Sequence, residues 1–404
     1  MKLHWIPLLI ALAVLLAIDF FAYRRLRRSA ASPRWAKPCY AAASALLYAV
    51  LGAALIFAHQ DSDAGLRVAM YLLLAFFGIQ GSKLVAMLIG SLSLRKNMEE
   101  RGRQFIRFAA VGVMTVLLLK LAWATLVTPF QIQVNHITIE SERVPEAFDG
   151  YRIVQFSDAH LGTYGTDTAF VSQYVDSINA QQPHMICFTG DLVNRHSREV
   201  DAFVPVLRRL RAADGVIAAQ GNHDQKFYYR WPSEQAWLAD SLRLHQQQRI
   251  MGWTPCVDSC ITVHRGADSI LVVGMQSFMP PHWKLPIKFK DICASSYQEG
   301  TFKILLQHVP NVWKYYIDPK SEGEKDNPVH IDLTLAGHTH AMQMQFTLFG
   351  TQFSPASFVT PYWAGHYSEG DQHLYVNTGV GEVGVPMRIG VTPEITVITL
   401  KKKH

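Results

Sequence analysis

Five short clusters of aspartate, asparagine and histidine hold the residues best suited to chemistry in this chain of 404 residues. Each cluster follows an apolar run that is typical of a buried strand. Carboxylates can bridge two cations, and neutral imidazoles fill further coordination positions without adding charge. The pattern therefore predicts a site for divalent metal ions. The candidate ligands are Asp158, His160, Asp191, Asn222, His308, His338 and His340, with His223 and Asp224 beside them.

The spacing inside the clusters indicates that neighbouring ligands share an ion. In Asp158-x-His160 and His338-x-His340, alternate residues of an extended segment would point to one side and reach the same ion. Taken singly, a cluster would also suit a helix cap, a turn or a core histidine, but five in order favour a metal site. Glycines permit sharp turns and close backbone approach at Gly190, Gly221 and Gly337.

The elements that must position these clusters alternate between strand-like and helical stretches. Apolar strands separated by helix-length segments predict βαβ units and a sheet buried on both faces. In such sheets, sites form beyond the carboxyl ends of the strands, where these clusters lie. Closer strand spacing later in the chain predicts hairpins, so the expected class is a mixed α/β or α+β sandwich. The expected strands include 151–156, 184–188, 215–219, 302–306 and 331–335, and the expected helices are 167–181, 198–212 and 232–248.

Together the five clusters resemble the signature of the calcineurin-like metallophosphoesterases, over about residues 148–400. The resemblance is strongest to a bacterial membrane-anchored or exported branch. It implies a β-sandwich flanked by helices that holds two divalent ions, of which Mn, Fe and Zn all suit the ligands. It assigns Asp158, His160 and His340 to one ion and Asn222, His308 and His338 to the other, with Asp191 bridging them.

The same resemblance gives His223 a place near the leaving group, as a general acid or a charge-stabilising donor that Asp224 orients. One departure from the family pattern is Asn194, where many relatives carry an acid. Because that position is not a direct ligand, the expected metal centre is unaffected. Side chains that could line the substrate cleft are Arg195, His196, Tyr362, Trp363 and His366.

Four apolar runs occupy the N-terminal third of the chain, at about 5–23, 39–59, 68–91 and 107–130. Each approaches the ~20 residues that a helix needs to cross a bilayer. We therefore expect four transmembrane helices in residues 1–130, a linker at 131–147 and the metallophosphoesterase domain at 148–404. A cleaved signal peptide carries its positive charge before the apolar stretch, whereas here the charge follows the first run, which favours an uncleaved span.

The basic residues of the N-terminal third lie in two loops. The first loop carries six basic residues between Arg24 and Lys37 and no acidic one, and the second carries five between Arg95 and Arg107 against two glutamates. Short loops rich in Lys and Arg stay in the cytoplasm. The catalytic domain is then expected on the outer side of a bacterial inner or plasma membrane. The loops account for more than the net charge of +6, so that charge does not indicate an acidic partner. Nucleic acid is not expected, because no basic stripe with interleaved aromatic residues is present.

These observations predict a membrane-anchored enzyme that hydrolyses a phosphoester by attack of a metal-activated water. The short linker favours a lipid-linked or cell-envelope substrate. The alternative is a sensor or transport protein whose domain binds metal and ligand without turnover. Three ionisable residues fall inside the spans, Asp19, Lys83 and Lys120, and a structural pair of Asp19 with Lys83 or snorkelling lysines is favoured over transport. Cys256 and Cys260 are either a short disulfide or two free thiols.

Overall fold

The computed structural model describes residues 5–28, 33–94, 98–277, 292, 293, 298, 300–314 and 330–404. The chain divides into two compact units, and each is described by itself. The first comprises Met1–Thr125 with Gly384–Pro386, and the second comprises Leu126–Val383 with Met387–His404. The second unit contains every predicted metal ligand and is called the catalytic unit below.

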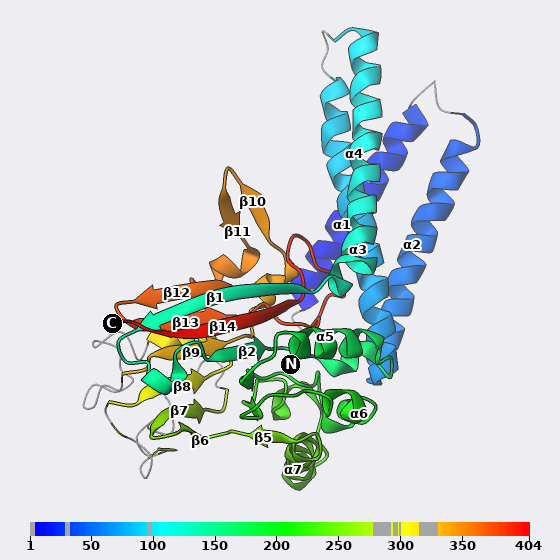
Figure 1. The fold of residues 1–404 in the computed structure, drawn as a ribbon. Helices are drawn as coiled ribbons and strands as arrows, with labels where there is room; N and C mark the ends of the chain where they lie inside the picture. Colours follow the sequence, from blue (N-terminus) through cyan, green and yellow to red (C-terminus); the bar gives the residue numbers. More distant parts are fainter. Residues whose placement is uncertain are drawn as a thin grey trace. The chain divides into compact units, whose positions relative to one another are not determined.

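The first unit is built from long apolar helices, as expected. They are α1 (Trp5–Arg28), α2 (Ala36–His59), α3 (Asp63–Ser91) and α4 (Glu100–Leu126), with a short 3₁₀ helix η1 (Leu92–Leu94) after α3 (Figure 1). Among the described residues, three segments are long and apolar enough to cross a membrane, namely Ala36–His59, Asp63–Ser91 and Glu100–Phe130. The first predicted span forms a helix, but it is not among these three.

A polar cluster lies inside this helical unit around the carboxylate of Asp19. Lys83 donates to Asp19 Oδ1 at 2.5 Å, which confirms the predicted pairing of these two residues. The carboxylate also accepts hydrogen bonds from Tyr40, Ser44, Tyr48 and Gln80 on α2 and α3. A carboxylate with five donors is satisfied within the protein, so this cluster is a structural one that links α1 to α2 and α3. Lys120 is exposed on α4.

Two six-stranded sheets form the body of the catalytic unit. One has the order β1-β14-β2-β3-β4-β5 and the other the order β12-β13-β9-β8-β7-β6. Neighbouring strands from β2 to β5 run parallel, and so do β7, β8, β9 and β13. The first sheet consists of β1 (Gln133–Ser141), β14 (Glu394–Lys402), β2 (Arg152–Phe156), β3 (Met185–Phe188), β4 (Val216–Ala218) and β5 (Trp253–Pro255). The second consists of β12 (Gly365–Glu369), β13 (Gln372–Val376), β9 (Leu333–Ala336), β8 (Phe302–Leu306), β7 (Asp268–Gly274) and β6 (Ser259–Arg265).

The two sheets pack face to face, because one buried cluster combines Ile153 and Ile217 of the first with Val272 and Ile304 of the second. A second cluster lies on the other face of the first sheet. There the helices α5 (Ala169–Ala180), α6 (Val204–Leu207) and α7 (Glu234–Ile250) cover the strands. The predicted sandwich with flanking helices is confirmed at this level.

Two details differ from the sequence-based expectation. The helix expected at 198–212 is broken into a 3₁₀ turn, η5 (Ser197–Val200), and the single turn α6. Pro205 has no N–H to donate, so a continuous helix could not extend through it. The expected linker also contains β1, which pairs in parallel with β14 from Gln133 to Ser141. Only residues 127–132 therefore connect α4 to the first strand of the catalytic unit.

Candidate metal centre

All seven predicted ligands lie just beyond the carboxyl ends of parallel strands, as expected. Asp158 and His160 follow β2, Asp191 follows β3 and Asn222 follows β4 in the first sheet. In the second sheet, His308 follows β8, and His338 and His340 follow β9. Because the two sheets pack face to face, these strand ends converge, and the six aspartate and histidine side chains form two adjoining groups at one edge of the sandwich.

The backbone at the ligands differs from the extended conformation expected from the sequence. Five ligands have positive φ: Asp158 (54°), His160 (44°), Asp191 (60°), His338 (73°) and His340 (48°). Such values are uncommon for residues other than glycine and concentrate at functional sites. Asp158 and His160 therefore reach a common point through left-handed turns, and not because alternate residues of a strand face one way. His338 and His340, which the spacing predicts to share an ion, fall in two different ligand groups.

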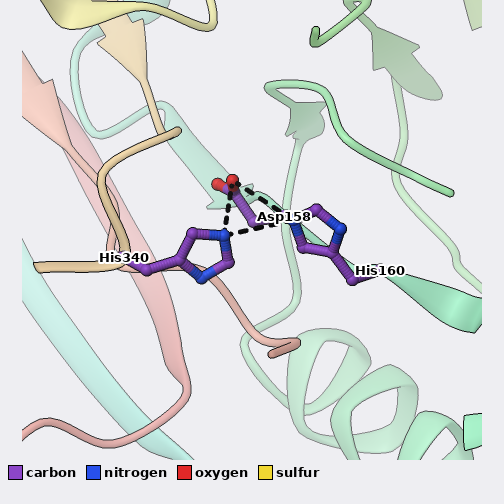
Figure 2. Close-up of side chains that lie close together, drawn as sticks. All are labelled: Asp158, His160 and His340. Atoms are coloured by element: carbon purple, nitrogen blue, oxygen red, sulfur yellow. Dashed lines mark hydrogen bonds and ion pairs between the residues drawn. The ribbon is translucent and has the colours of Figure 1, made fainter. Parts of the chain in front are cut away.

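The first group of ligands consists of Asp158, His160 and His340, which Figure 2 shows converging on one point. Asp158 Oδ1 lies 3.1 Å from His340 Nε2 and 3.9 Å from His160 Nε2. The two imidazole Nε2 atoms are 3.1 Å apart. Ligand atoms ~2.1 Å from a common cation lie at about this separation from one another. The geometry fits one divalent ion.

The second group consists of Asp191, His308 and His338. Asp191 Oδ2 lies 3.0 Å from His308 Nε2 and 3.7 Å from His160 Nε2, so this carboxylate stands between the two groups. Asn222 is buried, and its Oδ1 has no hydrogen-bond partner. An unsatisfied buried amide oxygen is costly unless a cation or water completes it. The donor set therefore fits a second divalent ion beside the first.

Hydrogen bonds fix which nitrogen of the ligating histidines is free. His308 Nδ1 donates to the Thr189 carbonyl at 2.8 Å, because a carbonyl can only accept. His160 Nδ1 lies 2.9 Å from Asn194 Oδ1. In both rings Nδ1 is occupied and Nε2 is the nitrogen left for an ion, which is the arrangement usual for metal-bound histidine.

The electrostatics of the cluster favour the charge states that metals need at Asp158, His160 and His338, but not at His308. Burial opposes ionisation of Asp158, but the adjacent histidines, His340 foremost, hold its pKa well below the usual value. Burial lowers the pKa of His160, and it lowers that of His338 to about 4. Against the effect of burial, Asp191 and Asp158 raise the pKa of His308 to about 9. Ionised carboxylates and neutral imidazoles are the forms that ligate cations. The shifts therefore favour ligation at Asp158, His160 and His338, whereas His308 would release a proton on binding an ion.

Glycines beside the ligands have a steric role. A Cβ on Gly221 would collide with the Asp191 carboxylate, and a Cβ on Gly337 would collide with Asp158 and Ser157. Any larger residue at these positions would displace a ligand. Two of the glycines singled out in the sequence are thus required by close approach.

Asp224 has a different role from the one expected. Its carboxylate accepts four backbone N–H groups: Gly221 and Asp191 at 2.9 Å, Leu192 at 2.8 Å and Val193 at 3.2 Å. Burial and the charge of Asp191 raise its pKa to about 7, against these donors, which favour the carboxylate. Asp224 therefore joins the loop after β4 to the loop after β3, and none of these contacts involves the His223 ring.

His223 is held by other groups. Its ring Nδ1 donates to the Asn194 carbonyl at 2.8 Å, and its backbone N–H donates to Asp191 Oδ1 at 2.7 Å. The ring also stacks on Tyr228, with centroids 3.6 Å apart. The Tyr228 hydroxyl in turn accepts a hydrogen bond from Asn222 Nδ2 at 2.8 Å. These contacts leave His223 Nε2 free to act on a substrate.

Asn194 and Arg388 are the supporting residues that the sequence analysis undervalued or missed. Asn194 contacts His160 through its side chain and His223 through its carbonyl. The fully buried Arg388 donates to the carbonyls of Thr378, Gly379 and Gly381. Gly381 N–H donates to the Asp158 carbonyl at 2.8 Å, so Arg388 supports the loop behind a ligand. A motif of polar residues after strands could have flagged Asn194, but nothing local marks Arg388.

The expected cleft residues divide into two sets. Arg195 donates to the Tyr228 carbonyl and lies over the Tyr229 ring, and His196 packs against that ring, so these two adjoin the His223 side of the site. The Trp363 carbonyl accepts a hydrogen bond from Thr339, between the two ligating histidines. His366 stacks with His373 on the outer hairpin β12–β13.

All five cysteines are free thiols, so Cys256 and Cys260 form no disulfide.

Comparison with known proteins agrees with this geometry. A family model described as calcineurin-like phosphoesterase matches residues 151–342. The metallophosphoesterase YkuE of Bacillus subtilis is 31% identical over 294 residues, which covers 70% of this chain and 90% of that protein. A transmembrane protein with metallophosphoesterase domain from Danio rerio is 30% identical over 281 residues, covering 67% of this chain and 57% of that protein. The chain belongs to the calcineurin-like metallophosphoesterases and is a metal-dependent phosphoesterase.

Proposed function

We propose that the protein is a membrane-anchored phosphoesterase with two divalent ions, acting on a phosphoester carried by a lipid or by a cell-envelope metabolite. The observation that supports the two-ion site is the position of Asp191. Its Oδ2 atom lies 3.7 Å from His160 and 3.0 Å from His308, so two ligand groups share one carboxylate. When bound, divalent ions at such a site activate water for attack on phosphorus and neutralise the phosphoryl oxygens.

Individual residues of the chain then hold the ions and donate a proton to the leaving group. Asp158, His160 and His340 hold one position, Asn222, His308 and His338 the other, and Asp191 serves both. His223 is the candidate general acid. Its Nδ1 is occupied by the Asn194 carbonyl, so protonated Nε2 is the atom that gives a proton to the departing oxygen. The stacked Tyr228 keeps the ring in one orientation.

The membrane assignment rests on the N-terminal helices and their loop charges. Three helices have the length and composition of membrane spans, and we propose that α1 is a fourth, because Asp19 is satisfied by donors from α2 and α3. Six basic residues between α1 and α2 favour a cytoplasmic position for that loop. With four spans, the catalytic unit lies on the outer face of a bacterial inner membrane.

The place where the chain enters the catalytic unit supports a substrate at the membrane. Gln133, the first residue of β1, pairs in parallel with Glu394 of β14, and β14 runs antiparallel to β2, with Thr396 opposite Gln155. Asp158 follows β2 by two residues. The metal ligands and the connection to the helices are therefore at the same end of the first sheet.

Hydrolysis of paired substrates tests this proposal. The full chain, reconstituted in vesicles of phosphatidylethanolamine and phosphatidylglycerol, is given methyl p-nitrophenyl phosphate in solution or hexadecyl p-nitrophenyl phosphate in the bilayer. The proposal predicts a higher kcat/KM for the bilayer ester, and p-nitrophenyl phosphate reports monoesterase activity in parallel. Equal kcat/KM for the two diesters would contradict the lipid-linked substrate and leave the phosphoesterase activity intact.

A further inference from the structure

A small hairpin of the catalytic unit exposes an unusual number of large apolar side chains. It is formed by β10 (Phe346–Leu348) and β11 (Thr351–Phe353) and is followed by the 3₁₀ turn η9 (Pro355–Phe358). Figure 1 shows the hairpin projecting from the sheets of its unit as a separate arm. We call residues 346–359 the aromatic arm. Its exposed apolar side chains are Phe346, Leu348, Phe349, Phe353, Phe358 and Val359.

The arrangement of these side chains gives the arm an apolar side. Phe346 lies opposite Phe353 and Leu348 lies opposite Thr351, so these residues share one face of the hairpin. Thr347 and Gln352 are on the other face. At the turn Phe349 is 98% exposed, and Phe358 beyond the hairpin is 82% exposed. An exposed apolar patch of this kind usually marks a surface that is covered in the working protein.

The absence of charge around the arm indicates what covers it. No Asp, Glu, Lys or Arg occurs between His340 and Glu369. Elsewhere in the catalytic unit, exposed Leu238 and Leu242 on α7 lie among charged neighbours such as Asp240 and Arg243. Phenylalanine and leucine on an uncharged projecting element suit the interfacial region of a bilayer. A protein partner would instead require a matched surface well beyond a hairpin with two three-residue strands.

The arm is attached at the end of the unit that receives the membrane helices. Gln345 N–H donates to the Ile389 carbonyl at 2.7 Å, at the base of the hairpin. Three residues further along, Thr392 Oγ1 donates to Gln133 Oε1 at 3.1 Å. Gln133 is the first residue of β1, and residues 127–132 connect it to α4. Six residues extend over at most ~20 Å, so a bilayer spanned by α4 is within reach of this edge.

The arm is also joined to the metal ligands. Ser354 Oγ, at the start of η9, donates to the carbonyl of Ala341 at 2.6 Å. Ala341 is the residue directly after His340. Thr339 Oγ1 donates to the Trp363 carbonyl at 2.5 Å from the other side of that histidine. Binding at the arm would therefore fix the orientation of the metal-bearing edge.

We infer that the aromatic arm inserts into the headgroup region of the bilayer and holds the metal centre against the membrane surface. The inference rests on the proposed membrane anchoring, and it deepens the proposed substrate class. A phosphoester at headgroup depth would then meet the site without leaving the membrane, because the ligand loop and the inserted arm are parts of one segment.

A depth measurement tests the insertion without any need for turnover. In a Cys39→Ser background, an NBD fluorophore is attached to Phe349→Cys or to Leu242→Cys of the full chain in vesicles of phosphatidylethanolamine and phosphatidylglycerol. Leu242 is the matched control, because it is an exposed leucine outside the arm. We expect blue-shifted emission and strong quenching by doxyl lipids at position 349 and neither at 242. The signal of the Cys39→Ser parent treated with the same fluorophore is subtracted from both. Water-like emission at both positions would overturn the inference.

Two further results would separate the alternatives. A blue shift at 349 that follows the protein-to-lipid ratio and resists doxyl quenching would show a second copy covering the arm, and would overturn lipid insertion. With Phe349→Asp and Phe358→Asp, we expect the ratio of bilayer to soluble diester turnover to fall about tenfold, while Leu242→Asp retains the parent ratio. If no ester is hydrolysed by any variant, the proposed function fails, and the fluorophore depth still decides the insertion.

Discussion

Asp224 offers the sharpest test of the structure, because the sequence and the structure give it different roles. The sequence-based expectation is that Asp224 orients His223. In the structure, Asp224 instead accepts the N–H groups of Gly221, Asp191, Leu192 and Val193. Its carboxylate therefore joins two ligand-bearing loops.

The magnitude for Asp224→Asn follows from the hydrogen bonds lost. The amide keeps one oxygen acceptor, so about two of the four buried N–H groups lose their partner, at roughly 1–3 kcal/mol each. Removing the charge relieves repulsion with Asp191, which offsets part of this loss. We expect a net destabilisation of about 2–3 kcal/mol, which corresponds to a decrease of roughly 4–12 °C in Tm for a domain of this size.

Thermal unfolding of the metal-loaded full chain in detergent measures this effect, with bound metal determined on the same samples. Asp240→Asn is the matched control, because Asp240 accepts one N–H and one hydroxyl from Ser197 away from the metal centre. It should lose no more than about 1 kcal/mol. If Asp224→Asn kept the parent Tm and metal content but lost turnover, the loop-joining role would be refuted and the His223-orienting role restored.

The remaining predictions concern the ligands and their supports. His223→Ala should keep its metal and lose about 10²–10⁴-fold in kcat, whereas equal loss of metal would refute the general-acid role. Asp191→Asn should deplete both ion positions together in elemental analysis, and loss of one ion alone would contradict bridging. Asn194→Ala should weaken metal affinity or activity about 10–100-fold through the freed His160 ring, with a smaller effect for Asn194→Asp. Arg388→Met should lower Tm, because several buried carbonyls lose their donor. An unchanged Tm would contradict this supporting role.

The strand-end positions of the ligands made most of the site predictable. Asp158, Asp191 and His308 each follow an apolar strand, and parallel strands bring their carboxyl ends to one edge. The pairing of Asp19 with Lys83 was also predictable, because charged side chains inside apolar helices need partners of opposite charge. These inferences depend on local patterns and on rules that hold for any sheet or span.

The parts that the sequence could not predict depend on contacts between distant residues. Asp224 accepts three of its four backbone N–H groups from residues some thirty positions earlier in the chain. Arg388 lies beyond all the motifs and acts on carbonyls of a loop whose shape no local pattern specifies. The sequence predicts a linker where β1 lies, because the edge position and partial exposure of this strand give an alternation too weak to recognise without β14.

The most direct test of the central claim is metal-dependent hydrolysis by the purified full chain. The protein is stripped with chelator, dialysed, and assayed on p-nitrophenyl phosphate and its methyl diester during titration with Mn²⁺, Fe²⁺ or Zn²⁺. We predict that hydrolysis is lost on stripping and returns as the second equivalent of metal binds, and that Asp191→Asn does not recover. Hydrolysis that survives complete removal of metal, or full recovery with a single equivalent, would contradict the two-metal account.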